Sequence, residues 1–497
     1  MEPSADNRSR WVALAALVIC TAWIIWLNPV GFMGGGADDT EYLQSVRCWV
    51  GAGEPCLART HWASRWPIVA PIALATGLLG ESRTTVAIAP LLYTCATLLL
   101  MIFIGNRLFG RPAGYAAAAA LVLTPSFAMQ ALQPAADGIE LSWLLASFAA
   151  ALAAFDRNSG RWAIAAGVAL GIAAQTRDTS LAMFPIAALA VVLLARGERR
   201  NMLWILPGML LPIAAEALTY WIVAGDPFWR FRLSLGHVHI LSAELPEGFD
   251  TSQSPLFNPN YIAAWKREAQ ISVFWPVDPW LNLLASYRLG PTLWAAILLA
   301  ILFTGRFLET AARRWITWLL GGALLYSATL VYGLAIDPKA RMFFVLCAVC
   351  SLTIGALVVR AWRGDGKLGV ATIVIAFVPF ASLIVALQNE SRTSERAAAK
   401  WIERFPGQVE IDRGARAYLM LAAGVDRLPD RGSGRPLLIS KAERRCSEFV
   451  RPDPGKPARA TVIAKQRMGG IESINGRTIS EMCLLRYAPG YRPPVEE

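Results

Sequence analysis

The chain has 497 residues, of which 55% are hydrophobic and only 17% are charged, and its mean hydropathy is +0.43. Soluble proteins carry about 25% charged residues, so this composition excludes an ordinary set of globular domains and indicates a membrane protein. The formal net charge is +11. No basic stripe interleaved with aromatic residues accompanies it, which argues against nucleic-acid binding, because Lys and Arg collect in the cytoplasmic loops of multispanning proteins.

The first apolar run, residues 11–27, follows the basic sequence NRSR. We expect an uncleaved anchor with a cytoplasmic N-terminus. A cleaved signal peptide is the alternative, but the run is longer than a usual signal segment and no A-x-A site follows it. The sequence GFMGGGADDTEYL comes next and places Asp38 and Asp39 on the far side of the membrane. These adjacent carboxylates are either a solvated helix cap or the working group of an enzyme.

Ten further apolar runs bring the expected number of membrane spans to about eleven. They lie near residues 84–104, 113–131, 138–155, 162–175, 179–195, 201–223, 289–304, 315–334, 342–359 and 368–387. When the chain is threaded alternately, arginine-rich loops such as GNRLFGR, DRNSGR and RAWRGDGK all fall on the side of the N-terminus. This pattern follows the positive-inside rule and places the C-terminal segment outside.

Two large loops and a terminal domain are expected on the outer side. Residues 31–83 contain WPIVAPIALATGLLG, whose two prolines favour an interfacial or re-entrant helix. Residues 224–287 are rich in aromatic side chains, which either anchor the loop at the headgroups or line a substrate groove. After a transmembrane domain of residues 1–388, residues 389–497 are charged, with SERAAAKWIERF predicted as an amphipathic helix and PLLIS and ATVIAK as strands. We expect a small soluble α/β domain there.

Cysteine and histidine suggest no cofactor site. Cys347 and Cys350 have C-x-x-C spacing inside an apolar run, which favours packing over redox chemistry. Each outer pair, Cys48 with Cys56 and Cys446 with Cys483, is either a disulfide of an oxidising compartment or two thiols. The histidines, His61, His237 and His239, all lie in outer loops. His237 and His239 have the spacing i, i+2 and could share a metal on a strand, but no third ligand is evident, so we expect no metal site.

Charged side chains gather in the short loops of the outer face. Beside the acidic pair they are Asp137 in QPAADGIE, Arg177 and Asp178 in QTRDTS, and Asp337, Lys339 and Arg341 in IDPKAR. Each of these residues alone is interpreted as a solvated loop residue or a helix cap. Charge near a bilayer is costly, however, at about 2.5–3.5 kcal/mol at a helix centre, and all of these residues share one face, so a functional role competes with that interpretation. Arginines can hold the phosphate of a lipid-linked donor, and one carboxylate can act as a base on the acceptor. A single displacement would then invert the anomeric centre of the sugar.

The order of these residues resembles the GT-C superfamily of polyprenyl-phosphate-sugar-dependent glycosyltransferases, in its protein O-mannosyltransferase and aminoarabinose-transferase-like branch. DDTEYL is similar to the Asp-Glu-x-x-Tyr motif of that branch, with Asp38 on the Asp, Asp39 in place of the Glu and Tyr42 on the Tyr. HWASRWPIVAPIAL is similar to an Arg-then-Pro segment and implies roles for Arg65 and Pro67, and IDPKARMFFVLCAV resembles a late Arg-containing segment. The resemblance covers roughly residues 11–390 and not the terminal domain.

The resemblance implies a polytopic helical fold with a GT-C-like first outer loop, and an inverting hexosyl- or pentosyltransferase. Asp38 would be the catalytic base and Asp39 its partner. The residues that would contact substrate are Tyr42, Arg65, Asp137, Arg177, Lys339 and Arg341, of which the arginines would hold the donor phosphate. No metal or other cofactor is implied. The donor would be a polyprenyl-phosphate sugar, the acceptor a glycan, lipid or protein of the cell envelope, and the location the inner membrane with a periplasmic C-terminal domain.

Two other classes of function compete with this interpretation. A transporter or flippase of lipid-linked substrates would also carry intramembrane charges, but it predicts charges near mid-membrane and internal repetition. The sequence concentrates its charges on one face and shows no repeat. A scaffold whose outer domain binds a partner would need the acids only as caps. Sugar, acceptor and oligomeric state are not specified by the sequence.

Overall fold

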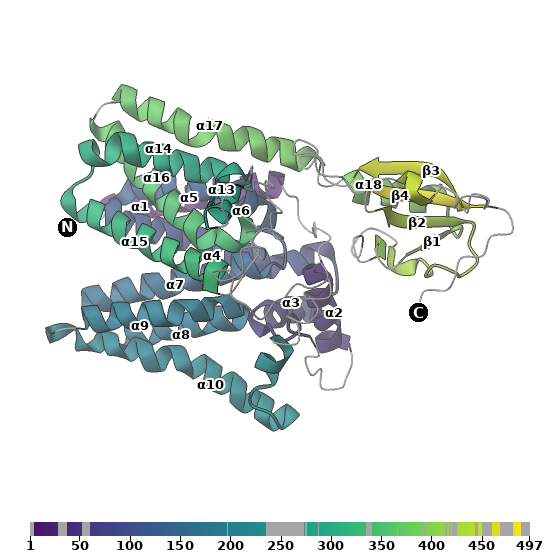
Figure 1. Cartoon of the computed structure of the whole chain (residues 1–497), viewed down its shortest axis with the longest axis horizontal. Coiled ribbons are helices and arrows are strands. Elements are labelled where there is room, and N and C mark those ends of the chain that lie inside the picture. Colours follow the sequence, from purple (N-terminus) through teal and green to yellow (C-terminus); the bar gives the residue numbers. More distant parts are fainter. Residues whose placement is uncertain are drawn as a thin grey trace.

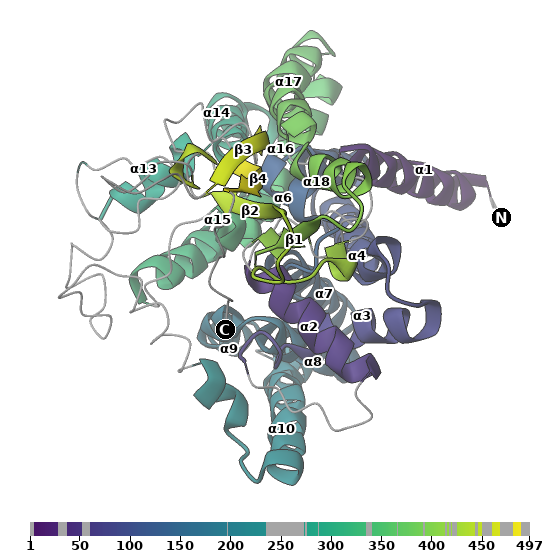
Figure 2. The same cartoon turned by 90° about the vertical axis from the view of Figure 1, so that its right-hand side faces the viewer.

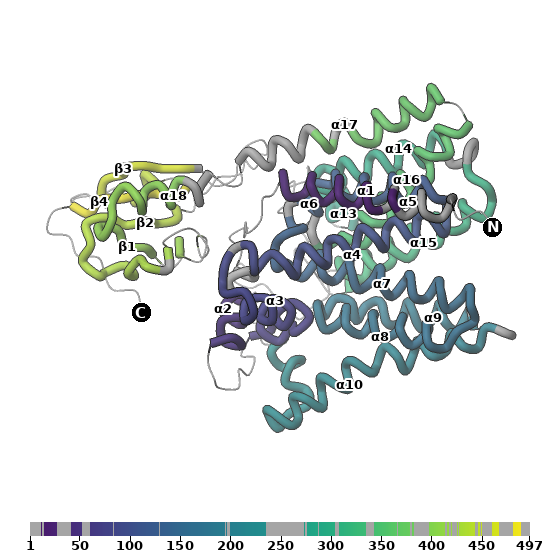
Figure 3. Tube along the Cα trace, turned by 180° about the vertical axis from the view of Figure 1, so that it is seen from behind, coloured from purple at the N-terminus to yellow at the C-terminus, as the bar shows by residue number. Residues whose placement is uncertain are grey.

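The computed structural model describes residues 4–27, 37–51, 60–195, 197–234, 273, 276–286, 288–333, 340–364, 366–390, 393–412, 415–416, 419, 425–442, 446–449, 460–467 and 481–488. Within them the chain forms a bundle of helices followed by a small sheet (Figure 1). The start of α1 and the sheet lie toward opposite ends of the long axis (Figures 1 and 3).

Within the described residues, the predicted apolar runs lie almost entirely in helices of the bundle. These are α1 (Ser4–Leu27), α2 (Ala37–Gly51), α3 (Trp66–Leu79), α4 (Arg83–Phe109), α5 (Arg111–Val122), α6 (Pro125–Gln130), α7 (Ala136–Arg157), α8 (Gly160–Thr176), α9 (Met183–Leu194), α10 (Ile205–Ala224), α13 (Asp278–Ala285), α14 (Gly290–Phe307), α15 (Thr310–Ala328), α16 (Phe344–Gly364) and α17 (Gly366–Glu390). The run 113–131 is divided between α5 and α6, because Thr124 precedes a proline and takes an extended conformation.

Several helices can cross a membrane, so the chain is a polytopic membrane protein. Five of the described helical stretches are long and apolar enough on their own: Thr84–Phe109, Ala136–Arg157, Arg199–Ala224, Thr310–Gly333 and Phe344–Gly364. The pair α13 and α14, bent by 98°, makes a sixth if it counts as one span. Shorter apolar stretches lie in α1, α3, α9 and α17. The helices α1 and α17 are themselves 24 and 25 residues long, so the predicted number of about eleven spans stays a prediction.

Small residues let the helices approach closely. A Cβ atom on Gly167 of α8 would lie 2.2 Å from the Ile205 carbonyl oxygen of α10, and one on Gly114 of α5 would lie 2.2 Å from the Ile102 carbonyl oxygen of α4. Backbone contact of this kind is typical of membrane helices, where the gain comes from packing and not from leaving water. α16 packs against α5, α14 and α17 and is buried along most of its length. Figure 2 shows α16 beside α14 and α17.

The C-terminal part contains a four-stranded sheet in the order β1-β2-β4-β3. Its elements are α18 (Thr393–Arg404), β1 (Val409–Ile411), β2 (Leu437–Ala442), β3 (Ala460–Arg467) and β4 (Glu481–Tyr487). β1 runs parallel to β2, and the other pairs are antiparallel. The apolar side of α18, including Ala398 and Trp401, packs with Ile439 and Leu484 of the sheet. The predicted helix and the strands at PLLIS and ATVIAK are therefore confirmed, and β1 and β4 were not foreseen.

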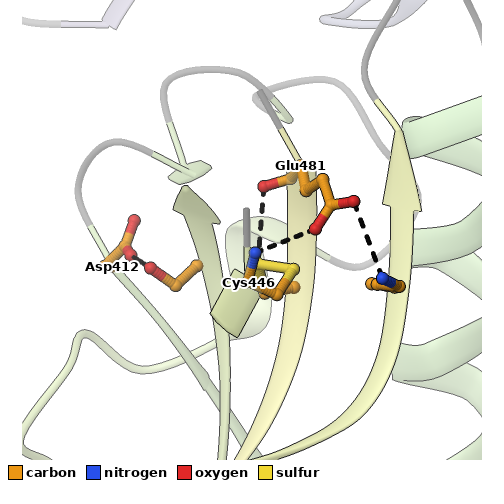
Figure 4. The surroundings of a disulfide bond; sticks show 6 residues. Asp412, Cys446 and Glu481 are labelled. Atoms are coloured by element: carbon orange, nitrogen blue, oxygen red, sulfur yellow. Dashed lines mark hydrogen bonds and ion pairs between the residues drawn. A yellow bond between two sulfur atoms is a disulfide. The ribbon is translucent and has the colours of Figure 1, made fainter. Parts of the chain in front are cut away.

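A disulfide joins Cys446 to Cys483 and decides one of the alternatives that the sequence left open (Figure 4). Both sulfurs are buried in a second apolar cluster of the sheet, and the Glu481 carboxylate accepts a hydrogen bond from the Cys446 N–H at 2.8 Å. Cys48 is also disulfide-bonded, and Cys56 lies outside the described residues. The thiols of the C-x-x-C pair in α16 are both free and buried.

Candidate functional site

The first helix of the site, α2, carries the acidic motif at the end of the bundle nearer the sheet (Figure 1). Asp38 and Asp39 lie in its first turn, and their side chains lie outside the described part of the chain. Tyr42 follows one turn later and is completely buried, and its hydroxyl accepts a hydrogen bond from Nη1 of Arg65 at 2.5 Å. Arg65 directly precedes α3. Two residues that the sequence analysis named separately thus form one contact that joins α2 to the start of α3.

Arg65 has an unused hydrogen-bond donor. Its Nε is buried and has no partner among the described groups. A buried donor without an acceptor costs about 1–3 kcal/mol, so this nitrogen is suited to an anion that enters the site. Burial by itself lowers the pKa of Arg65, but the nearby Tyr42 and Asp178 outweigh that effect and raise it above its ordinary value. The guanidinium therefore stays charged.

A buried ion pair joins Asp137 to Arg177. Nη1 of Arg177 lies 2.7 Å from Oδ1 of Asp137 and 3.4 Å from Oε2 of Glu140, and each of the three side chains is no more than 8% exposed. Asp137 and Glu140 stand one turn apart at the start of α7, so both carboxylates face the same guanidinium. The sequence analysis named Asp137 and Arg177 but not Glu140, although an acid three residues after Asp137 in an apolar run was a visible signal.

Hydroxyl groups from two other elements complete the surroundings of Glu140. Its Oε1 accepts hydrogen bonds from Thr179 (3.0 Å) and Ser180 (2.5 Å) of η1 (Asp178–Ala182) and from Tyr326 (3.2 Å) of α15. With Arg177 on the other oxygen, the carboxylate is bonded on both sides, as a buried charge must be. Glu140 therefore ties α7 to η1 and α15.

A second ion pair begins at the next residue of the chain. α8 ends at Thr176, and Arg177 takes an extended conformation (φ −156°, ψ 127°), so that Asp178 starts η1. Oδ1 of Asp178 accepts from Nη2 of Arg230 at 2.8 Å, and Oδ2 accepts from the hydroxyl of Ser234 at 2.7 Å. Burial raises the pKa of Asp178, but the positive charges of Arg230 and Arg65 outweigh it and hold this pKa below its ordinary value. Asp178 is thus ionised at neutral pH.

The remaining predicted residues lie partly outside the description. Lys339 is outside the described residues, as are Asp337, His237 and His239. Arg341 belongs to the short helical turn η4 (Ala340–Phe343), but its side chain is not described. Its neighbour Met342 contacts Arg177, whose Nη2 donates to the sulfur, so η4 lies beside the first ion pair.

No metal site is evident in the part of the chain that the structure describes, where no three His, Cys, Asp or Glu side chains converge. His61 is buried with its ring 3.8 Å from that of Trp62. The carboxylates of the first cluster face arginine and hydroxyl donors.

Structures of known proteins decide the fold. AglB, an oligosaccharyltransferase of Archaeoglobus fulgidus, in complex with an inhibitory peptide and dolichol-phosphate, matches with a TM-score of 0.52 and 12% identity. The match covers 83% of this chain and 60% of AglB, so the chain spans less than two thirds of that relative. An oligosaccharyltransferase of the same organism, tethered to an acceptor peptide with the NVT sequon, matches with a TM-score of 0.53 and 11% identity, over 88% of this chain and 70% of that protein. The chain has the GT-C fold.

A family model and a further solved structure also match the chain. Residues 67–222 match the family model for dolichyl-phosphate-mannose-protein mannosyltransferase, which is less than half of the chain. ArnT from Cupriavidus metallidurans in the apo state has a TM-score of 0.45 and 15% identity, over 99% of this chain and 100% of ArnT. No curated protein sequence matches the chain.

Proposed function

We propose that this protein is an integral-membrane, inverting glycosyltransferase that moves a hexosyl or pentosyl group from a polyprenyl-phosphate donor to an acceptor of the cell envelope. The GT-C fold, the family match at residues 67–222 and the dolichol-phosphate in the AglB complex support this class of donor. The observation that carries the proposal is the contact of Tyr42 with Arg65. It holds an arginine whose buried Nε has no partner among the described groups, beside the helix whose first turn contains Asp38 and Asp39.

In this proposal Asp38 removes the proton of the acceptor hydroxyl or amine while that oxygen or nitrogen attacks the anomeric carbon. The bond from this carbon to the phosphate oxygen breaks, and the polyprenyl phosphate leaves with the electron pair. A positioned base of this kind contributes roughly 10²–10⁴-fold, and one displacement inverts the anomeric centre. Asp39 supports the base. A phosphate is already a good leaving group, so the step needs no metal or other cofactor.

The contacts of the arginines divide the work between them. Both terminal nitrogens of Arg177 are used by protein groups, namely Asp137, Glu140 and Met342. We therefore assign to Arg177 the task of holding Asp137 in place on the substrate side. Arg65, whose Nε has no partner in the described part of the chain, is the better ligand for the donor phosphate, and Lys339 and Arg341 would complete the site.

The proposed location is the inner membrane, with the N-terminus in the cytoplasm and residues 389–497 in the periplasm. The start of α1 and the sheet lie toward opposite ends of the molecule, which supports opposite sides for the two (Figure 3). The buried disulfide of the sheet suits an oxidising compartment.

The test uses cells from which the protein's own gene has been deleted. These cells are complemented with the wild type, with Asp38→Asn or with the control Asp156→Asn. Asp156 pairs with Arg107 in an exposed ion pair far along the sequence from the acidic motif. Mass spectrometry of surface glycans and lipids should show one additional sugar with the wild type and with Asp156→Asn. Asp38→Asn should insert normally and show none. Full transfer by purified Asp38→Asn would refute the mechanism, and movement of an unchanged lipid-linked sugar across the membrane would indicate a flippase.

A further inference from the structure

Arg230 is a buried arginine that the sequence analysis did not single out. It lies in the short helical segment 229–234 that follows α10, and it is 4% exposed. Nη1 donates to both carboxylate oxygens of Glu216 in α10, at 3.1 and 3.2 Å. Nη2 donates to the Ala174 carbonyl at 2.7 Å and to Asp178 at 2.8 Å. One guanidinium thus connects α10, the last turn of α8 and the first residue of η1.

The segment after α10 holds both oxygens of one carboxylate. Arg230 binds Oδ1 of Asp178, and Ser234, one helical turn later, binds Oδ2. Asp178 cannot turn without breaking two bonds, and the Ala174 contact fixes the helix end four residues before it. Between these two fixed points stands Arg177, whose side chain forms the ion pair with Asp137.

From this arrangement we infer that Arg230 is a positioning residue, which sets the direction of Arg177 toward Asp137 by holding the backbone on both sides of it. This inference rests on the proposed function, since it assigns the Arg177–Asp137 pair to the substrate site. Arg230 itself touches neither Asp137 nor Glu140 in any described contact, so its effect passes through the turn at residues 174–178.

Packing of α8 on α10 does not depend on this ion pair. Gly167 and Gly171 of α8 bring the two backbones into contact, and Gln175 donates to the Pro212 carbonyl of α10 at 2.7 Å. Buried ion pairs often add little to stability compared with apolar residues of similar volume, and their best-attested value is to specify one arrangement. Other contacts already hold α8 against α10, and the Arg230–Asp178 pair therefore serves to fix the orientation of the turn that follows α8.

The experiment is a double-mutant cycle with Arg230→Met, Arg177→Met and the double variant in purified full-length protein. Donor turnover is measured with a polyprenyl-phosphate sugar, and melting temperature is measured without substrate. Because a misplacement of about 1 Å can cost about 100-fold in rate, Arg230→Met should lower kcat by about 10- to 100-fold and leave the donor KM within about two-fold. In the Arg177→Met background it should lower kcat no further. Arg230→Lys, which keeps the charge, should recover part of the rate.

The matched control is Arg107→Met, which removes the arginine of the exposed Arg107–Asp156 pair and should leave kcat unchanged. Additive losses of Arg230→Met and Arg177→Met in kcat, or a loss that only follows the folded fraction, would overturn the inference. If the wild type transfers no sugar, the proposed function fails, and the melting cycle then decides the inference. If the double variant loses less melting temperature than the sum of the two single variants, Arg230 and Arg177 belong to one arrangement. Strictly additive losses refute the inference. Arg230→Lys serves this cycle if Arg230→Met does not fold.

Discussion

Replacement of Arg177 by Met tests whether the contacts of Arg177 with Asp137 and Glu140 are shielded from water. The change removes the guanidinium and keeps a long apolar side chain. It leaves Asp137 without its 2.7 Å contact and takes one partner from Glu140, which keeps the hydroxyls of Thr179, Ser180 and Tyr326. The main cost is therefore the loss of the guanidinium beside Asp137, because Glu140 remains hydrogen-bonded.

The magnitude follows from burial. All three charged side chains are at most 8% exposed, and breaking such a pair by removing one partner costs about 3–5 kcal/mol. The pair of Arg107 and Asp156 has an even shorter contact, 2.6 Å, but its side chains are 52% and 33% exposed. An exposed pair contributes about 0.2–1 kcal/mol. Arg177→Met should therefore cost at least about 2 kcal/mol more than Arg107→Met in spite of the similar contact distances.

The measurement is reversible unfolding of both variants in mixed micelles, followed by tryptophan fluorescence against denaturing detergent. Arg177→Lys, which keeps a charge but offers a smaller head group, should fall between the wild type and Arg177→Met. Equal losses of less than about 1 kcal/mol in Arg177→Met and Arg107→Met would refute the reasoning. That result would mean that the acids of α7 are hydrated and do not need the arginine.

Three further outcomes follow from other parts of the molecule. Gly167→Val should prevent close packing of α8 on α10, because its Cβ would lie 2.2 Å from a backbone oxygen. The loss of stability should exceed the roughly 1–3 kcal/mol that is typical of overpacking, and a lower melting temperature would show it. Cys446→Ser opens a disulfide that spans 37 residues and should cost about 4 kcal/mol in the unfolding of the sheet, which calorimetry can measure. Asp178→Asn should flatten the acid limb of melting temperature against pH. Because the folded pKa of Asp178 is below the ordinary 3.8, its contribution is present at neutral pH and is lost as the pH falls below that value.

The helices were predictable because their signal is local. An apolar run long enough to reach across a bilayer has few alternatives to a helix, and each of the eleven runs is helical. Breaks inside a run, such as the one at Thr124, were less predictable. In the sheet, β2 and β3 follow clear apolar runs, whereas β1 has three residues and gains its pairing from β2, a partner distant in sequence.

The site was foreseen in part for the same reason. Sidedness placed Asp137 and Arg177 on one face, and their contact at 2.7 Å agrees with that expectation. Glu140, Glu216 and Arg230 were missed because two of them lie within apolar runs and one at the edge of an aromatic loop. Charge within an apolar run is costly, so an acid there predicts a buried partner, but the sequence does not identify that partner. Pairing depends on how α7, α8 and α10 meet in three dimensions.

The balance of charge narrows the choice of phosphate ligands. The described cluster contains four acids and three arginines, namely Asp137, Glu140, Asp178, Glu216, Arg65, Arg177 and Arg230. A lipid phosphate would add negative charge to a cluster that already has one acid in excess. Arg177 and Arg230 are each bonded to two acids, so neither has a positive charge to spare. We therefore expect the phosphate to bind at Arg65, whose Nε has no partner among the residues that the structure describes, and to require Lys339 and Arg341 as additional cations. Loss of donor binding should then be larger for Arg341→Met than for Arg177→Met, although Arg177 is the more deeply engaged residue.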